Sequence, residues 1–141
     1  MTIIWRDEMS VGDERIDGDH KRLINLVNGF EWATVGEVNF ALLKKILSDL
    51  ENYTVVHFER EEEIQDTIDY PYRDAHKAAH RSLIHELHKV QEHVTAAAAK
   101  EGEEGTKVAQ EMAVFLKHWI VDHVIEEDLR MKPFILKHKG Q

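Results

Sequence analysis

The chain has 141 residues and a formal net charge of −9, a length that suits one compact domain. The acidic balance argues against nucleic-acid binding, because no basic stripe is present that could displace the counterions of phosphates. The chain has no cysteine, which excludes disulfides, thiolate metal sites and cysteine nucleophiles. Any metal must therefore bind to nitrogen and oxygen.

The first sixteen residues lack helical periodicity, and we expect residues 1–16 to form an extended arm on the surface. Their apolar run, Ile3 to Trp5, is short and is followed at once by acidic residues. It is therefore neither a signal peptide nor a membrane anchor. A cytoplasmic protein without membrane insertion is the expectation.

The rest of the chain is rich in Ala, Leu, Glu and Lys and poor in glycine and proline, which predicts an all-helical fold. Apolar residues at helical spacing predict four helices, at about 17–32, 39–68, 72–100 and from 106 to beyond 128. The short connections predict antiparallel neighbours, and hence an up-down-up-down four-helix bundle over residues 17–131. Residues 132–141 are expected to be a C-terminal tail with a basic, solvated helix end. The whole of residues 1–141 is expected to form one domain.

Ten histidines are an unusual load for a chain of this length, so it matters which of them face the core. At about 100° per residue, five lie on the apolar stripes, with at least one on each helix: His20, His57, His76, His80 and His123. Glu61 lies one turn after His57 on the same face, whereas Glu62 and Glu63 point to solvent. Three further histidines point outward: His85, His93 and His118.

A single buried histidine is most simply a core residue with a hydrogen-bond partner. Five of them together with Glu61 favour a metal, because each unpaired polar group would cost a few kcal/mol to bury. The pairs His57/Glu61 and His76/His80 have the i, i+4 spacing that lets two side chains of one helix reach one site. Imidazole and carboxylate without sulfur suit iron, manganese or zinc, and the number of ligands indicates two ions bridged by carboxylates.

The segments IDGDHK at 16–21, HFEREE at 57–62, YP at 70–71 with HKAAH at 76–80, and WIVDH at 119–123 with Asp128 resemble those of bacterial hemerythrins of the stand-alone type. The resemblance implies two iron ions, bridged by an oxo or hydroxo group and by Glu61 and Asp128. It assigns one iron to three histidines, His76, His80 and His123. It assigns the other iron to His20 and His57, and this ion keeps the open position where dioxygen binds.

The second bridging carboxylate is the point on which helical geometry and resemblance differ. Glu127 is the i+4 neighbour of His123, whereas on an ideal helix Asp128 lies about 140° around the axis from His123. The resemblance selects Asp128. We therefore expect a local widening of the helix, or π-bulge, between His123 and Asp128.

The resemblance also places four apolar side chains around the oxygen site: Phe58, Trp119, Ile120 and Val124. They fit an ordinary core equally well, and the two interpretations are compatible. Two positions depart from the family. Gln65 stands where an apolar residue is usual, either as an edge residue or as a polar group near the pocket, and Met131 replaces a tyrosine.

The expected function is reversible oxygen binding, for carriage, storage or delivery, by a protein that is not an enzyme. A di-iron oxidase or peroxidase is the first alternative, and an oxygen or redox sensor is the second. Pocket polarity discriminates carrier from enzyme. The four apolar residues favour the carrier, and Gln65 favours the enzyme.

Overall fold

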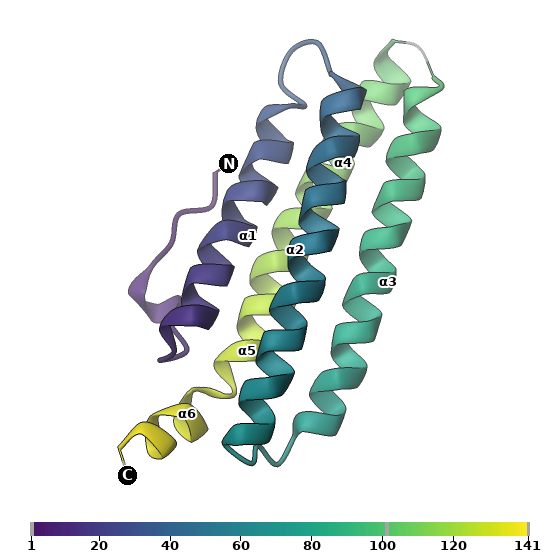
Figure 1. The fold of residues 1–141 in the computed structure, drawn as a ribbon. Helices are drawn as coiled ribbons and strands as arrows, with labels where there is room; N and C mark the ends of the chain where they lie inside the picture. Colours follow the sequence, from purple (N-terminus) through teal and green to yellow (C-terminus); the bar gives the residue numbers. More distant parts are fainter. Residues whose placement is uncertain (1, 101, 141) are drawn as a thin grey trace.

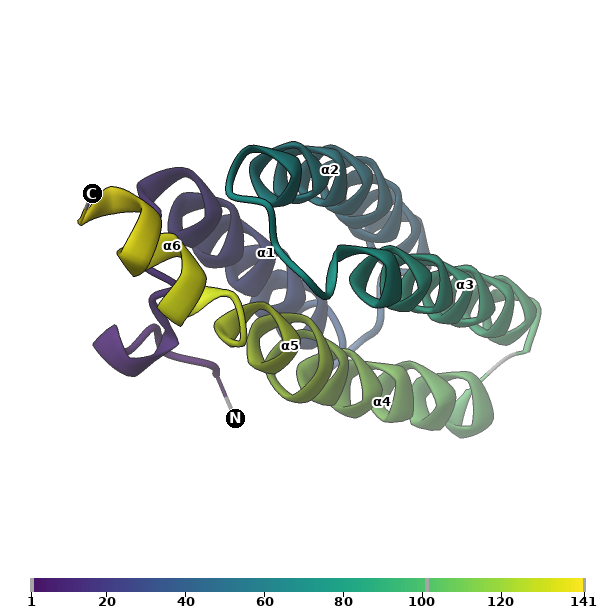
Figure 2. The ribbon, with the colours of Figure 1, turned by 90° about the horizontal axis from the view of Figure 1, so that it is seen from below.

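Four long helices form the body of the protein in a computed structural model that describes residues 2–100 and 102–140. They are α1 (Glu14–Trp32), α2 (Phe40–Thr67), α3 (Arg73–Ala98) and α4 (Glu103–His118). The fourth continues through a π-helical segment, η2 (Trp119–Ile125), into α5 (Glu126–Leu129), and α6 (Lys132–Lys139) follows. The helices run side by side with alternating direction (Figure 1) and surround one interior when seen from the end (Figure 2). The predicted antiparallel four-helix bundle is confirmed.

Side-chain caps explain where the first two long helices begin. The Asp13 carboxylate accepts hydrogen bonds from the backbone N–H groups of Arg15 and Ile16 at 2.9 and 3.1 Å. This N-cap starts α1 at Glu14, three residues earlier than the apolar stripe indicated. The side chain of Asn39 caps α2 in the same way, and α2 begins at Phe40. This agrees with the predicted start of that helix at about residue 39.

The N-terminal arm lies along α1, as expected (Figure 1), and contains one short 3-10 helix, η1 (Asp7–Met9). The Asn28 side chain holds it by exchanging two hydrogen bonds with the backbone of Ile3, at 2.9 and 2.8 Å. The C-terminal tail differs from expectation, because α6 is more than a solvated helix end. Its Ile135 is buried in an apolar cluster that also contains Val11 of the arm.

The buried interior has a large and a small apolar core, separated by a layer of buried polar side chains. Along α1, Ile16 belongs to the small core and Leu23 to the large one, with His20 between them. The same order holds along α2, where Leu50 belongs to the large core, His57 follows, and Ile64 belongs to the small core. The polar layer therefore crosses the bundle in the half nearer the α2–α3 connection.

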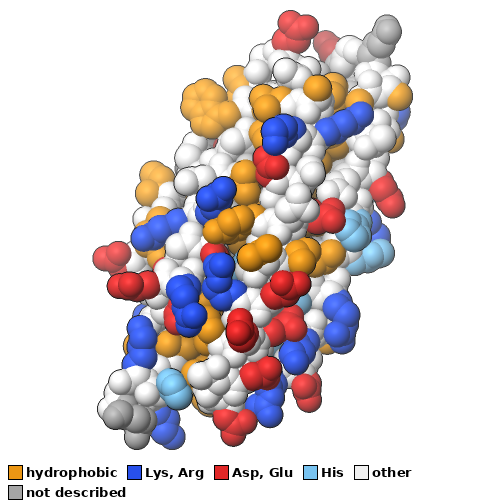
Figure 3. Space-filling view, viewed as in Figure 1, with side chains coloured by type: hydrophobic (Ala, Val, Ile, Leu, Met, Phe, Trp, Pro, Cys, Tyr) orange, Lys and Arg blue, Asp and Glu red, His pale blue; other side chains and the backbone are white. Residues whose placement is uncertain are grey.

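The surface mixes charges of both signs. On the face shown in Figure 3, Asp and Glu side chains alternate with Lys and Arg side chains, and apolar side chains lie among them. Among residues 2–100 and 102–140, no helix is both long and apolar enough to cross a membrane.

Candidate metal centre

The polar layer brings together six of the seven residues expected to bind metal. They come from α1, α2, α3 and α5, and each is at most 4% exposed: His20, His57, Glu61, His76, His80 and Asp128. Helical spacing on three separate elements thus delivers four imidazoles and a carboxylate to one point. The second carboxylate arrives from the short helix that follows η2.

The two carboxylates lie between two pairs of histidines, which we call the His20/His57 pair and the His76/His80 pair. Asp128 Oδ2 is 2.7 Å from His20 Nε2 and 3.3 Å from His57 Nε2, whereas Asp128 Oδ1 is 2.9 Å from His76 Nε2. Glu61 Oε2 is 3.1 Å from His57 Nε2, and Glu61 Oε1 is 2.9 Å from His80 Nε2. Each carboxylate therefore presents one oxygen to each pair.

Two groups of four donors follow from this arrangement, and they share both carboxylates. One group adds the His20/His57 pair to Glu61 and Asp128, and the other adds the His76/His80 pair. In each, the potential ligand atoms lie within 4.8 Å of one another. Buried nitrogen and oxygen donors in this number suit a non-haem metal such as iron. The six residues present therefore fit a non-haem metal centre, without the seventh expected ligand, His123.

The electrostatics of the layer favour charged side chains despite burial. Burial opposes ionisation of Asp128, but hydrogen bonding with Glu61 and with the histidines holds its pKa well below the usual range. Burial also opposes protonation of His76, but hydrogen bonds to Asp128 and Glu61 raise its pKa to about 10. The layer is thus arranged to hold positive charge between the two carboxylates, which protons or metal ions can supply.

His123 does not join this layer, and the prediction that it faces the core is wrong. Its side chain is exposed, whereas Ile120, three residues before it, and Val124, directly after it, are buried. In η2 the hydrogen bonds run from residue i to i+5, so residues five apart share a face. Trp119, Ile120, Val124 and Ile125 accordingly turn inward, and His123 turns outward. Its role as a ligand stays a prediction.

The structure favours Asp128 over Glu127 at the site. Asp128 is 1% exposed and contacts three histidines, whereas the Glu127 side chain is 32% exposed and lies 3.6 Å from Arg130. The expected widening of the helix is present, but it begins at Trp119 and ends at Ile125, earlier than predicted. The phase shift within η2 is what turns Asp128 inward.

The four residues expected to surround an oxygen site are all buried: Phe58, Trp119, Ile120 and Val124. The Phe58 ring stacks on the His80 ring, with centroids 3.8 Å apart and planes 5° from parallel. The Trp119 indole N–H donates to the Leu83 carbonyl at 3.1 Å. This indole donor is therefore engaged with the backbone of α3 and not with a histidine.

Two carboxylates beside the histidines were missed or misplaced by the sequence analysis. Asp19 is 3% exposed and accepts a hydrogen bond from His57 Nδ1 at 3.0 Å. Its spacing of three residues from Ile16 and four from Leu23 was the available signal. Glu62 was expected to point to solvent, but its carboxylate accepts from His80 Nδ1 at 2.9 Å.

Gln65 is a buried polar group, so the first of its two interpretations, an edge residue, is wrong. It is 0% exposed, and its Nε2 donates to the sulfur of Met131 at 3.1 Å. The two departures from the family pattern are therefore in contact with each other. They lie one helical turn beyond the two carboxylates, at i+4 from Glu61 and i+3 from Asp128.

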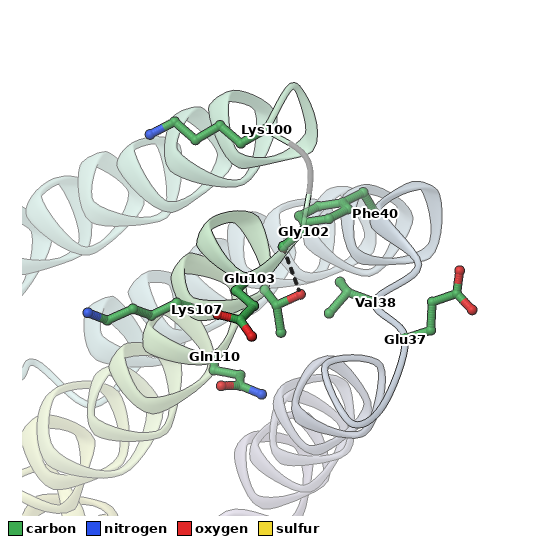
Figure 4. Close-up of a pocket in the computed structure, with 9 residues that line it drawn as sticks. Glu37, Val38, Phe40, Lys100, Gly102, Glu103, Lys107 and Gln110 are labelled. Atoms are coloured by element: carbon green, nitrogen blue, oxygen red, sulfur yellow. Dashed lines mark hydrogen bonds between the residues drawn. The ribbon is translucent and has the colours of Figure 1, made fainter.

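A surface pocket of about 590 Å³ lies at the opposite end of the bundle, between the α1–α2 and α3–α4 connections. Figure 4 shows that Glu37 points away from Lys100 and Lys107, whose side chains both extend toward the opposite side of the view. Thr106 uses its hydroxyl to bond the Gly102 carbonyl at 3.3 Å. Among the described residues that line this pocket, the charged side chains are all exposed, so the buried polar layer is the stronger candidate.

The fold and the buried donors together define a metal-binding four-helix-bundle protein. The family model for the hemerythrin HHE cation binding domain matches residues 11–135. The chain therefore belongs to the hemerythrin family, whose centre is a non-haem iron site.

Known proteins of this family are similar to this chain in sequence and in structure. The bacteriohemerythrin of Stenotrophomonas maltophilia is 24% identical over 99% of this chain and 85% of its own length. That of Clostridium acetobutylicum is 29% identical over 89% of this chain and 95% of its own length. A solved structure of a hemerythrin point mutant superposes with a TM-score of 0.78 at 26% identity, covering 96% of this chain and 98% of that one.

Proposed function

We propose that the polar layer holds two iron ions and that the protein binds dioxygen reversibly there. The observation that carries the proposal is the placement of Glu61 and Asp128, each with one oxygen toward either histidine pair. Carboxylates in this position can bridge two ions, as in other helical-bundle centres with paired metals. The iron ions, when bound, supply the electrons that reversible oxygen binding requires.

The proposed ligands are the six buried residues of the layer. The His20/His57 pair serves one ion and the His76/His80 pair the other, and the carboxylates serve both. His123 is kept as a candidate third histidine beside the His76/His80 pair, on the family resemblance alone. Its exposed side chain argues against it, and a His123→Ala variant with unchanged iron content would remove it from the ligand set.

The buried apolar side chains would favour release of oxygen over its reduction. Phe58, Trp119 and Val124 are each at most 4% exposed, and Phe58 stacks on the His80 ring. A dry, apolar surrounding offers no proton to bound oxygen, which is what an intact, reversible complex needs. The relatives named bacteriohemerythrin support the same class of function.

The direct test is metal analysis combined with absorption spectra. We expect two irons per chain, and we expect the reduced protein to give a coloured complex in air that fades under argon over repeated cycles. The contacts of both carboxylates with both pairs are the reason for the stoichiometry. A single zinc per chain, or colour that does not return after the first cycle, would contradict the proposal.

A di-iron oxidase is the second candidate, and the buried amide of Gln65 is the observation in its favour. Its Oε1 atom has no hydrogen-bond partner within the described part of the chain, so it could hold a water molecule below the carboxylates. The protein would then have a route by which protons reach the centre, which an oxidase needs and an oxygen carrier does not.

The variant Gln65→Leu separates the two functions. For a carrier we expect the lifetime of the oxygen complex to stay the same or lengthen, because leucine removes the polar group without opening the interior. Stopped-flow absorption and an oxygen electrode give the two measurements. Sustained oxygen consumption by the unmodified protein with a reductant, abolished in Gln65→Leu, would favour the oxidase.

A further inference from the structure

Each histidine pair contains one member whose Nδ1 atom is bound by a carboxylate and one whose Nδ1 atom is not. His57 Nδ1 bonds Asp19 at 3.0 Å, and His80 Nδ1 bonds Glu62 at 2.9 Å. The Nδ1 atoms of His20 and His76 have no hydrogen-bond partner among residues 2–100 and 102–140. The two proposed iron positions thus share one pattern, although different helices build them.

The shortest contacts of the four histidines with the two central carboxylates follow the same division. The histidines without an Nδ1 partner make the short contacts to Asp128, at 2.7 Å for His20 and 2.9 Å for His76. His57 and His80, which have such a partner, lie against Glu61 at 3.1 and 2.9 Å. The division is not exclusive, since His76 also contacts Glu61 at 3.1 Å and His57 also contacts Asp128 at 3.3 Å. The additional carboxylates therefore support one histidine at each proposed iron position.

Asp19 is itself held firmly in place. It is 3% exposed, and its Oδ1 atom accepts hydrogen bonds from Arg60 and, at 3.1 Å, from the Tyr53 hydroxyl. Its other oxygen is left for His57. Because α1 carries Asp19 and α2 carries the other three residues, this network ties the two helices together beside the centre.

Glu62 differs from Asp19 in exposure. Its side chain is 32% exposed, and it reaches His80 from the neighbouring helix α2. Phe58, also on α2, stacks on the other side of this contact against the His80 ring. Water can partly replace a carboxylate at such a position, whereas Asp19 is almost fully buried.

We propose that Asp19 and Glu62 are positioning residues, each of which orients one histidine so that its Nε2 lone pair faces the metal. A carboxylate on Nδ1 keeps the proton on that nitrogen, fixes the ring orientation and strengthens the imidazole as a ligand. Asp19 serves the His20/His57 position, and Glu62 serves the His76/His80 position. The inference rests on the proposed iron centre.

The test compares Asp19→Asn with Asp17→Asn. Asp17 is a matched control, because it is a hydrogen-bonded carboxylate of the same helix that accepts from Ser10 and Val11, away from the histidines. We expect Asp19→Asn to weaken iron binding about 10- to 100-fold in chelator competition. Asp17→Asn should leave the affinity unchanged, even if it lowers the melting temperature.

Mössbauer spectra of the iron-loaded variants add a readout that general destabilisation would not reproduce. Asp19→Asn should alter the signal of one iron environment and leave the other unchanged. Glu62→Gln, at a partly exposed side chain, should alter the other environment with a smaller loss of affinity. Equal affinity losses in Asp19→Asn and Asp17→Asn, or equal changes at both irons, would overturn the inference.

A measurement without metal separates this inference from the proposed iron centre. In the metal-free protein, the His57 Nδ1 proton bonded to Asp19 should give a downfield proton resonance that disappears in Asp19→Asn and persists in Asp17→Asn. If this resonance behaves as expected but the protein binds no iron, the proposed function fails and the hydrogen bond stands. If the protein binds two irons but the resonance is absent from the unmodified protein and from Asp17→Asn, the positioning role fails and the proposed iron centre stands.

Discussion

Replacing Asp128 by asparagine is expected to abolish the binding of two irons, whereas Glu127→Gln is expected to leave the iron content unchanged. An asparagine keeps the shape of the side chain but has one oxygen, and its NH₂ group would face histidine nitrogens that Asp128 now contacts on both sides. The Glu127 carboxylate lies near Arg130 at the surface and touches none of the histidines in the layer. Iron per chain, measured by elemental analysis of the purified variants, checks both statements.

The comparison is demanding because the two residues are adjacent and both acidic. Helix propensity and net charge change in nearly the same way in the two variants, so a general effect of lost charge would appear in both. Two irons retained in Asp128→Asn, or an equal loss in Glu127→Gln, would contradict the placement of the second carboxylate. Either result would also remove the structural reason to expect two ions.

Removal of iron is expected to lower the melting temperature by about 10 °C or more. A ligand that binds only the folded state adds about 4 kcal/mol when its free concentration is a thousand times its dissociation constant, and roughly 3 °C per kcal/mol applies to a domain of this size. Without metal, the layer must hold Glu61 and Asp128, both buried, with protons alone. Thermal unfolding of the iron-loaded and chelator-treated protein measures the difference, and equal temperatures would place the iron outside the folded core.

The difference should widen as the pH rises. In the metal-free protein the pKa of His76 is raised to about 10, above its unfolded value of about 6.5. Its stabilising contribution is therefore complete below about pH 6.5 and is lost as the pH approaches 10. Iron requires deprotonated imidazoles, so its binding is favoured in the same range. Unfolding curves at pH 6.5 and pH 9 should show the metal-free protein losing stability and the iron form keeping it.

Helical phase predicted most of the site because most of the site lies on regular helices. His57 and Glu61 share a turn of α2, and His76 and His80 share a turn of α3, so a rotation of about 100° per residue placed them correctly. The same rule placed His85 outward, and its side chain is exposed. The four-helix architecture could be predicted for the same reason, together with the short connections.

The rule failed where the backbone leaves the regular helix or where a contact crosses between helices. The π-helical turns of η2 shift the phase, which exposes His123 and turns Asp128 inward. Glu62 projects from the flank of α2, and only the distance to α3 reveals that it meets His80. Periodicity within one helix contains no information on such distances. The resemblance to a family supplied Asp128, which the periodicity alone would have given to Glu127.

The polar layer divides the interior very unequally, and this gives the molecule two regions of different local stability. Among the described residues, twenty buried apolar side chains lie in the large core and six in the small one, which α6 and the arm help to close. Local opening costs least where few apolar contacts are broken. We therefore expect the small core to open locally more often than the large core, and such opening beside Asp128 would give an ion a path in or out without global unfolding.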